Sequence, residues 1–132
     1  MTLSAFKTKT IYLHLGTYKT ATTFIQHVLY HSFGDPDSPV YFPRVGNHGT
    51  AHHYLATNEF PGWTNGVTQD EYKKVWKRLL ENIRGSAADC VVISSEMLCS
   101  LTLDRIRYIR ETLKDYRLKA IIYLRRQDQY IS

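Results

Sequence analysis

Three short segments of the chain have the composition and spacing of β-strands. In 10–16, apolar residues at every second position alternate with tyrosine and histidine, as in a strand whose two faces meet different surroundings. The segments 90–94 and 120–124 are short runs rich in valine, isoleucine and leucine, which is also typical of buried strands. We therefore expect one strand in each of these segments.

Between these segments, apolar residues recur at helical spacing. The clearest helix is predicted over 68–85, where Thr68 and Glu71 form the ends of a capping box and Gly85 is placed to end the helix. Two further helices are predicted over 22–31 and 103–116. Their apolar stripes are Phe24, Ile25, Val28 and Leu29 in the first, and Leu103, Ile106, Ile109 and Leu113 in the second.

The connection 32–67 is long and contains all four prolines of the chain. We expect irregular structure there, with a short helix over 52–57. A connection of this length inside a compact domain usually has a function of its own.

Strands that alternate with helices predict an α/β fold with a parallel sheet, in which ligands bind beyond the carboxyl ends of the strands. Lys19, Glu96 and Arg125 each follow a predicted strand. Such a sheet usually has about five or more strands, and the pattern shows three. We therefore expect 1–132 to be one domain that is incomplete at its C-terminus, the N-terminal part of a larger unit. The alternative is a small open α/β unit.

The loop after the first predicted strand has the character of an anion site. It reads Gly16-Thr17-Tyr18-Lys19-Thr20-Ala21-Thr22-Thr23. A helix that starts directly after a strand directs unpaired N–H groups and the positive end of its dipole toward one place, which favours phosphate. The plainer interpretation is a threonine-rich first helical turn with a solvated lysine.

This loop differs from the Walker A motif, G-x-x-x-x-G-K-[ST], because its lysine stands three places earlier, at Lys19. A strand followed by K-T-[GA]-T-T and a helix resembles the phosphosulfate loop of sulfotransferases that use 3′-phosphoadenosine 5′-phosphosulfate (PAPS). The run YLRRQD at 123–128 resembles the bacterial members of that family. With the segment 89–100, DCVVISSEMLCS, the resemblance spans nearly the whole chain.

The resemblance implies a three-layer, P-loop-like sheet and a transferase that moves a sulfuryl group from PAPS to a hydroxyl or amine, with no metal required. The backbone N–H groups of Thr20, Ala21, Thr22 and Thr23 would hold the phosphosulfate. Lys19 would stabilise the bridging oxygen. Arg125 or Arg126 would bind the 3′-phosphate, and Arg125 is preferred for its spacing. The family serine eight places after that arginine would fall at position 133, whereas Ser132 lies seven places after Arg125.

The general base has two candidates. Glu96 follows the second strand, where cytosolic sulfotransferases carry a histidine, and a desolvated carboxylate there could accept a proton. Glu96 could also cap a helix or orient Lys19. His53, with His52 beside it, lies in the long connection in a pattern that resembles an acceptor-side segment of bacterial members, and histidine titrates near neutrality. Ser95 could hydrogen-bond the donor or simply end a strand.

The acceptor is the least defined partner. Aromatic residues of the long connection could line a pocket for a small molecule or a carbohydrate, or they could cover an edge of the sheet. These residues are Tyr41, Phe42, Tyr54, Phe60 and Trp63.

Composition narrows the partners further. The net charge of +5 suits an anionic ligand, but the absence of a dense Lys/Arg run makes nucleic acid the weaker interpretation. No stretch has the length of an apolar membrane span or the core of a signal peptide, so we expect a cytoplasmic protein. Two other functions fit less well: a P-loop nucleotide kinase or NTPase with a degenerate loop, and a non-catalytic fragment that binds an anion.

Overall fold

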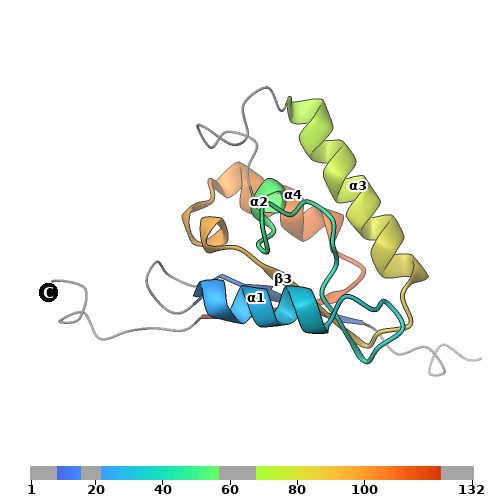
Figure 1. Ribbon diagram of the computed structural model, residues 1–132. Coiled ribbons are helices and arrows are strands. Elements are labelled where there is room, and N and C mark those ends of the chain that lie inside the picture. Colours follow the sequence, from blue (N-terminus) through green and yellow to red (C-terminus); the bar gives the residue numbers. More distant parts are fainter. Residues whose placement is uncertain (1–8, 16–21, 57–67, 123–132) are drawn as a thin grey trace, which may run out of the picture.

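A computed structural model describes residues 9–15, 22–56 and 68–122 of the chain, which form an α/β fold (Figure 1). The strands are β1 (Thr10–His14), β2 (Val40–Tyr41), β3 (Cys90–Ser94) and β4 (Arg117–Ile121). The helices are α1 (Thr22–Ser32), α2 (His53–Ala56), α3 (Gln69–Gly85) and α4 (Leu103–Thr112), with the 3₁₀ helix η2 (Glu96–Ser100) after β3.

The described strands form one parallel sheet in the order β2-β3-β1-β4. The expected parallel α/β sheet is therefore confirmed. The sequence missed β2, which is only two residues long and is fixed by pairing with β3 and by a 3.1 Å hydrogen bond from the Cys90 N–H to the Pro39 carbonyl. The last strand was predicted over 120–124, but β4 begins at Arg117 and ends at Ile121.

The helices divide between the two faces of the sheet (Figure 1). The chain runs from β1 to β2 in one direction across the sheet, and from β2 through β3 to β4 in the other. Right-handed crossovers place helices of opposite direction on opposite faces. In agreement, α1 contacts the sheet through Gln26 and Ser94, whereas α3 and α4 share the main apolar core with Ile93.

Helix α3 supplies the largest part of that core. Its predicted capping box is present, because the Thr68 hydroxyl accepts from the Glu71 N–H and the Glu71 carboxylate accepts from the Thr68 N–H, both at 3.1 Å. The helix ends at Gly85 as predicted. Four residues of its apolar stripe are fully buried in the core that β3 and α2 share, namely Tyr72, Trp76, Leu79 and Ile83, and Val75 and Leu80 are partly buried.

The stripes predicted for the other two helices are only partly buried. On α1, Phe24 is 70% exposed and Val28 40% exposed, while Gln26 is the fully buried residue. Helix α4 ends at Thr112 rather than 116; Ile109 and the C-cap residue Leu113 are buried, but Leu103 and Ile106 are exposed. A buried glutamine on an apolar helix needs hydrogen-bond partners, and these lie in the candidate site. Within the described ranges, no helix has both the length and the apolar character needed to cross a membrane.

Candidate functional site

A pair of hydrogen bonds between His52 and the end of β3 builds the site. The His52 N–H donates to the Ser94 carbonyl at 2.8 Å, and the Ser94 N–H donates to His52 Nδ1 at 3.0 Å. Because these two residues are locked together, the next residues on each segment also meet. His53 Nδ1 lies 2.6 Å from Ser95 Oγ.

Helix α2 is held in place from the other side by α3. The Tyr72 hydroxyl and the Trp76 indole N–H both donate to the Leu55 carbonyl, each at 3.0 Å. That carbonyl belongs to the end of a short helix, where it has no partner within the helix. The two donors therefore fix the segment that carries His53.

The second half of the site connects β1, β3 and α1. His14 and Ser94 are paired in the register of the sheet, so their side chains point to the same face. His14 Nδ1 lies 2.7 Å from Ser94 Oγ, which also accepts from the amide of Gln26 at 3.0 Å. All three side chains are buried, so the hydrogen bonds offset the cost of their desolvation.

Glu96 joins the two halves. Its Oε2 lies 3.7 Å from His53 Nε2 and accepts from the Gln26 amide at 3.4 Å. The side chains of His53 and Glu96 are 14% and 15% exposed, so they are the members that a ligand can reach. We call this group the strand-end cluster; it consists of His14, Gln26, His53, Ser94, Ser95 and Glu96.

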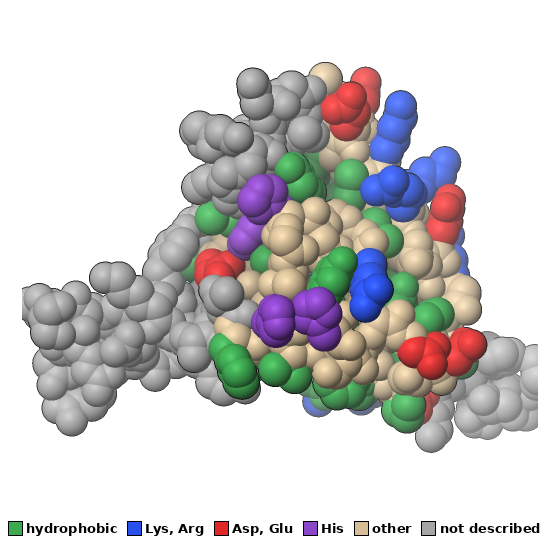
Figure 2. Space-filling model, in the orientation of Figure 1, with side chains coloured by type: hydrophobic (Ala, Val, Ile, Leu, Met, Phe, Trp, Pro, Cys, Tyr) green, Lys and Arg blue, Asp and Glu red, His purple; other side chains and the backbone are tan. Residues whose placement is uncertain are grey.

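The cluster lies beside α2, at the carboxyl ends of β1 and β3. On the face shown in Figure 2, histidine side chains gather near α2 with an acidic side chain beside them, and a second histidine group lies over α1. The first group includes His48, whose ring centroid is 6.1 Å from that of His53. The second consists of His27 and His31, with ring centroids 4.4 Å apart.

The electrostatics of the cluster favour a neutral histidine next to a carboxylate. Burial lowers the pKa of His53 below its ordinary value; Glu96 opposes this shift, and His48 adds to it. Burial also lowers the pKa of His14, again opposed by Glu96. A neutral imidazole can accept a proton, and a neighbouring carboxylate stabilises the imidazolium that results. The site can therefore do general-base chemistry.

His52 has a different role from His53. Because its Nδ1 accepts from Ser94, its Nε2 carries the proton and donates to the Pro43 carbonyl at 2.6 Å. Full burial lowers its pKa to about 4. Both ring nitrogens are occupied, so His52 is a structural residue and is excluded as the base. Of the two neighbouring histidines, only His53 reaches the edge of the site.

Ser95 is also structural. Its hydroxyl caps η2 by accepting from the Met97 N–H at 3.0 Å while it bonds to His53. It is fully buried, so it orients the imidazole and does not face a ligand.

The aromatic residues Tyr41 and Phe42 of the long connection are buried in the core and do not line a pocket. Phe60 and Trp63 lie outside the described residues.

The anion-binding residues predicted from sequence fall mostly outside the described residues. The residues outside the described ranges are Lys19, Thr20, Ala21, Arg125 and Arg126. Thr22 and Thr23 are the first two residues of α1. The described chain therefore contains both flanks of the predicted loop, β1 on one side and the N-terminus of α1 on the other.

Sequence reasoning brought out Glu96 and His53 as rivals, and the structure brings them together. It missed His14, Gln26 and Ser94. A glutamine inside the apolar pattern of 22–31 and a polar residue at the end of each buried strand were the available signals. Among the described residues, no three His, Cys, Asp or Glu side chains are grouped as metal ligands.

Comparison of the chain with protein-family models, with curated proteins and with solved structures gives no match in any of the three.

Proposed function

We propose that this protein is a sulfotransferase that moves a sulfuryl group from PAPS to a hydroxyl or amine acceptor on a P-loop-like sheet. The observation that carries the proposal is the meeting of His53 and Glu96, 3.7 Å apart, at the carboxyl end of β3. Sulfuryl transfer to a hydroxyl or amine needs a base at that end of the sheet, next to the loop that follows β1.

The topology supports a nucleotide-type donor at the same place. In the order β2-β3-β1-β4, the connection after β1 leaves toward β2, and the connection after β3 leaves toward β4. Where two neighbouring parallel strands send their connections to opposite faces of the sheet, α/β proteins bind ligands beyond the carboxyl ends of those strands. In this sheet those strands are β1 and β3, which carry His14 and Ser94.

The residues that we propose to bind PAPS are inferred from the sequence. The segment 16–21 connects β1 to α1, an 11-residue helix whose N-terminus favours phosphate. Gln26 lies one turn into α1 and contacts Glu96 at 3.4 Å, so the first turn of α1 adjoins the strand-end cluster. Lys19 would stabilise the leaving oxygen from this loop. Arg125 or Arg126 would hold the 3′-phosphate.

The chemistry assigned to the cluster is one proton transfer. His53 Nε2 takes the proton of the acceptor as the acceptor oxygen or nitrogen forms its bond to sulfur. The bond between sulfur and the bridging oxygen breaks, and adenosine 3′,5′-bisphosphate leaves with the electron pair. Ser95 holds the imidazole through Nδ1, and Glu96 stabilises the imidazolium. The two rival bases of the sequence thus act as a pair, with His53 as the base.

Calorimetric titration of the full chain tests the donor assignment. Adenosine 3′,5′-bisphosphate should bind more tightly than ATP with Mg²⁺, and Lys19→Ala should abolish that binding. Lys73→Ala is the matched control, because Lys73 is exposed on α3, and it should bind as the native chain does. Preference for Mg-ATP would replace the proposal with a nucleotide kinase or NTPase. Binding of neither nucleotide would contradict both enzymes.

A further inference from the structure

An apolar groove of about 320 Å³ lies on the α4 face of the sheet. Aliphatic side chains from β1, β4, η2 and α4 line it, including Leu13, Leu98, Ile106 and Leu118. Leu13 is paired with Ala120, and Ile11 with Leu118, in the register of the sheet, so both strands present small or aliphatic residues to the same side. Among the described residues that line the groove, Arg110 alone is charged.

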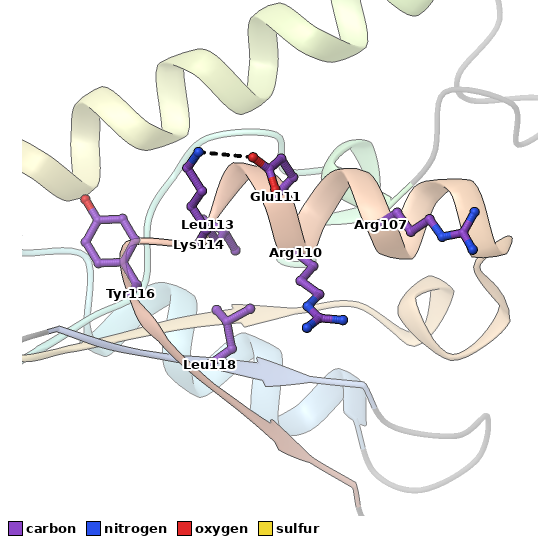
Figure 3. Close-up of a pocket in the computed structure, with 7 residues that line it drawn as sticks. All are labelled: Arg107, Arg110, Glu111, Leu113, Lys114, Tyr116 and Leu118. Carbon is purple, nitrogen blue, oxygen red and sulfur yellow. Dashed lines mark hydrogen bonds and ion pairs between the residues drawn. The ribbon is translucent and has the colours of Figure 1, made fainter.

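Arg110 and Leu118 also line a second, larger pocket of about 740 Å³. Its described lining is cationic, with Arg107, Arg110 and Lys114 and one carboxylate, Glu111. Figure 3 shows the Arg110 side chain reaching from α4 toward the sheet, whereas Lys114 turns to Glu111, at 3.1 Å. No carboxylate of the described residues pairs with Arg107 or Arg110.

The two pockets together form one amphipathic site. An aliphatic groove of this volume is within the range of small-ligand sites, and it shares Arg110, which has no carboxylate partner among the described residues, with the cationic pocket. A guanidinium binds a carboxylate or similar planar anion through two parallel hydrogen bonds. The chemistry that satisfies both parts is a molecule with an alkyl chain and an anionic head group.

We propose that the face between α4 and the β1–β4 edge binds an anionic amphiphile of the fatty-acid type, with its chain in the groove and its carboxylate at Arg110. The site is separate from the strand-end cluster. Successive side chains of a strand point to opposite faces, so Leu13 enters the groove while His14 faces α1. The inference does not depend on the proposed sulfotransferase activity.

Calorimetric titration of the full chain with decanoate, below the concentration at which it aggregates, tests the site. Decanoate should bind at one saturable site, 1-decanol should bind more weakly, and acetate should not bind measurably. Arg110→Gln should weaken decanoate binding about threefold to fivefold, as expected for an exposed charge pair, and leave decanol unaffected. Ile106→Gln should weaken both ligands, because it removes apolar lining.

Two control variants match these changes. Arg84→Gln removes a charge from α3, and Leu103→Gln removes an exposed apolar side chain from α4 that does not line the groove; neither should change the affinity. The absence of saturable decanoate binding would overturn the proposal, as would equal binding by the native chain and both test variants. A native dimer that Ile106→Gln dissociates, seen by sedimentation, would instead assign the groove to a second copy of the chain.

Discussion

The two faces of the sheet at the carboxyl end of β1 differ sharply although the same strand builds both. On the α1 face, His14 enters a buried group of hydrogen bonds with Ser94 and Gln26. On the α4 face, the residues on either side of His14, Leu13 and Leu15, line an open apolar groove. The alternation of side chains along a strand is enough to separate the two chemistries.

The two faces are held in place by different kinds of interaction. The polar face is specified by partners, because each buried donor or acceptor must find one specific atom. The apolar face is specified only by area and shape, so it tolerates an open groove and exposed residues such as Ile106. We therefore expect substitutions on the polar face to affect function most, and substitutions on the apolar face to affect stability according to burial.

The largest effect is expected on the polar face, from His53→Gln. This change removes the proposed base while keeping a side chain that can bond to Ser95. Turnover of PAPS, followed as release of adenosine 3′,5′-bisphosphate with a panel of phenols and sugars, should fall about 10²–10⁴-fold. Binding of the bisphosphate should stay unchanged. His27→Gln, an exposed histidine on α1, is the control, and an equal loss of turnover in both variants would contradict the role of His53.

On the apolar face, two isoleucines one turn apart on α4 test whether the effect of a substitution on stability follows burial. Ile109 is 4% exposed and Ile106 is 48% exposed. Ile109→Ala should lower the free energy of unfolding by about 2–4 kcal/mol because it leaves a cavity, whereas Ile106→Ala should cost less than about 1 kcal/mol. Urea unfolding of the two variants measures the difference. Similar losses in both would mean that the groove is closed in solution.

The sequence predicts those features of the fold that depend on residues close together in the chain. The capping box of α3 and its apolar stripe were predicted correctly because both depend on residues three or four places apart. The strand β2 was missed because a two-residue strand is defined by pairing with β3. The stripe of α1 was only partly right, since Gln26 is buried by Ser94 and Glu96, which are distant in sequence.

The candidate site shows the same division. Lys19 and Glu96 stand out because they follow predicted strands, and that position alone marks them. His52 and His53, in contrast, are adjacent residues of the same type, and no sequence pattern distinguishes them. Only the tertiary hydrogen bonds to Ser94 and Pro43 make His52 structural and leave His53 at the edge of the site.

The buried imidazole of His52 predicts how the stability of the fold depends on pH. Its pKa is about 4 in the folded chain and about 6.5 when unfolded, so the unfolded chain binds more protons between these values. Stability should therefore be complete above about pH 6.5 and fall as the pH drops toward 4, by roughly 2–3 kcal/mol at pH 4.5. Burial of His53 and His14 acts in the same direction.

Urea unfolding at pH 7.5 and pH 4.5 measures this loss. His52→Asn should be less stable at pH 7.5, but its stability should change less between the two pH values. His31→Asn, exposed on α1, should retain the native pH dependence. If His52→Asn lost as much stability between the two pH values as the native chain does, the acid sensitivity would come from other groups.

The smallest effect is expected from Gln26→Met, which keeps the length of the side chain but removes the amide that joins α1 to the polar face. Ser94 Oγ and Glu96 Oε2 each lose a donor, so the free energy of unfolding should fall by about 1–2 kcal/mol. Glu96 should also be held less firmly beside His53, which should lower turnover less than His53→Gln does. Phe24→Met, on the exposed side of the same helix, should change neither quantity. If Gln26→Met were as stable and as active as the native chain, the polar face would not depend on the hydrogen bonds of the Gln26 amide. The two faces of β1 would then differ only in how deeply their side chains are buried.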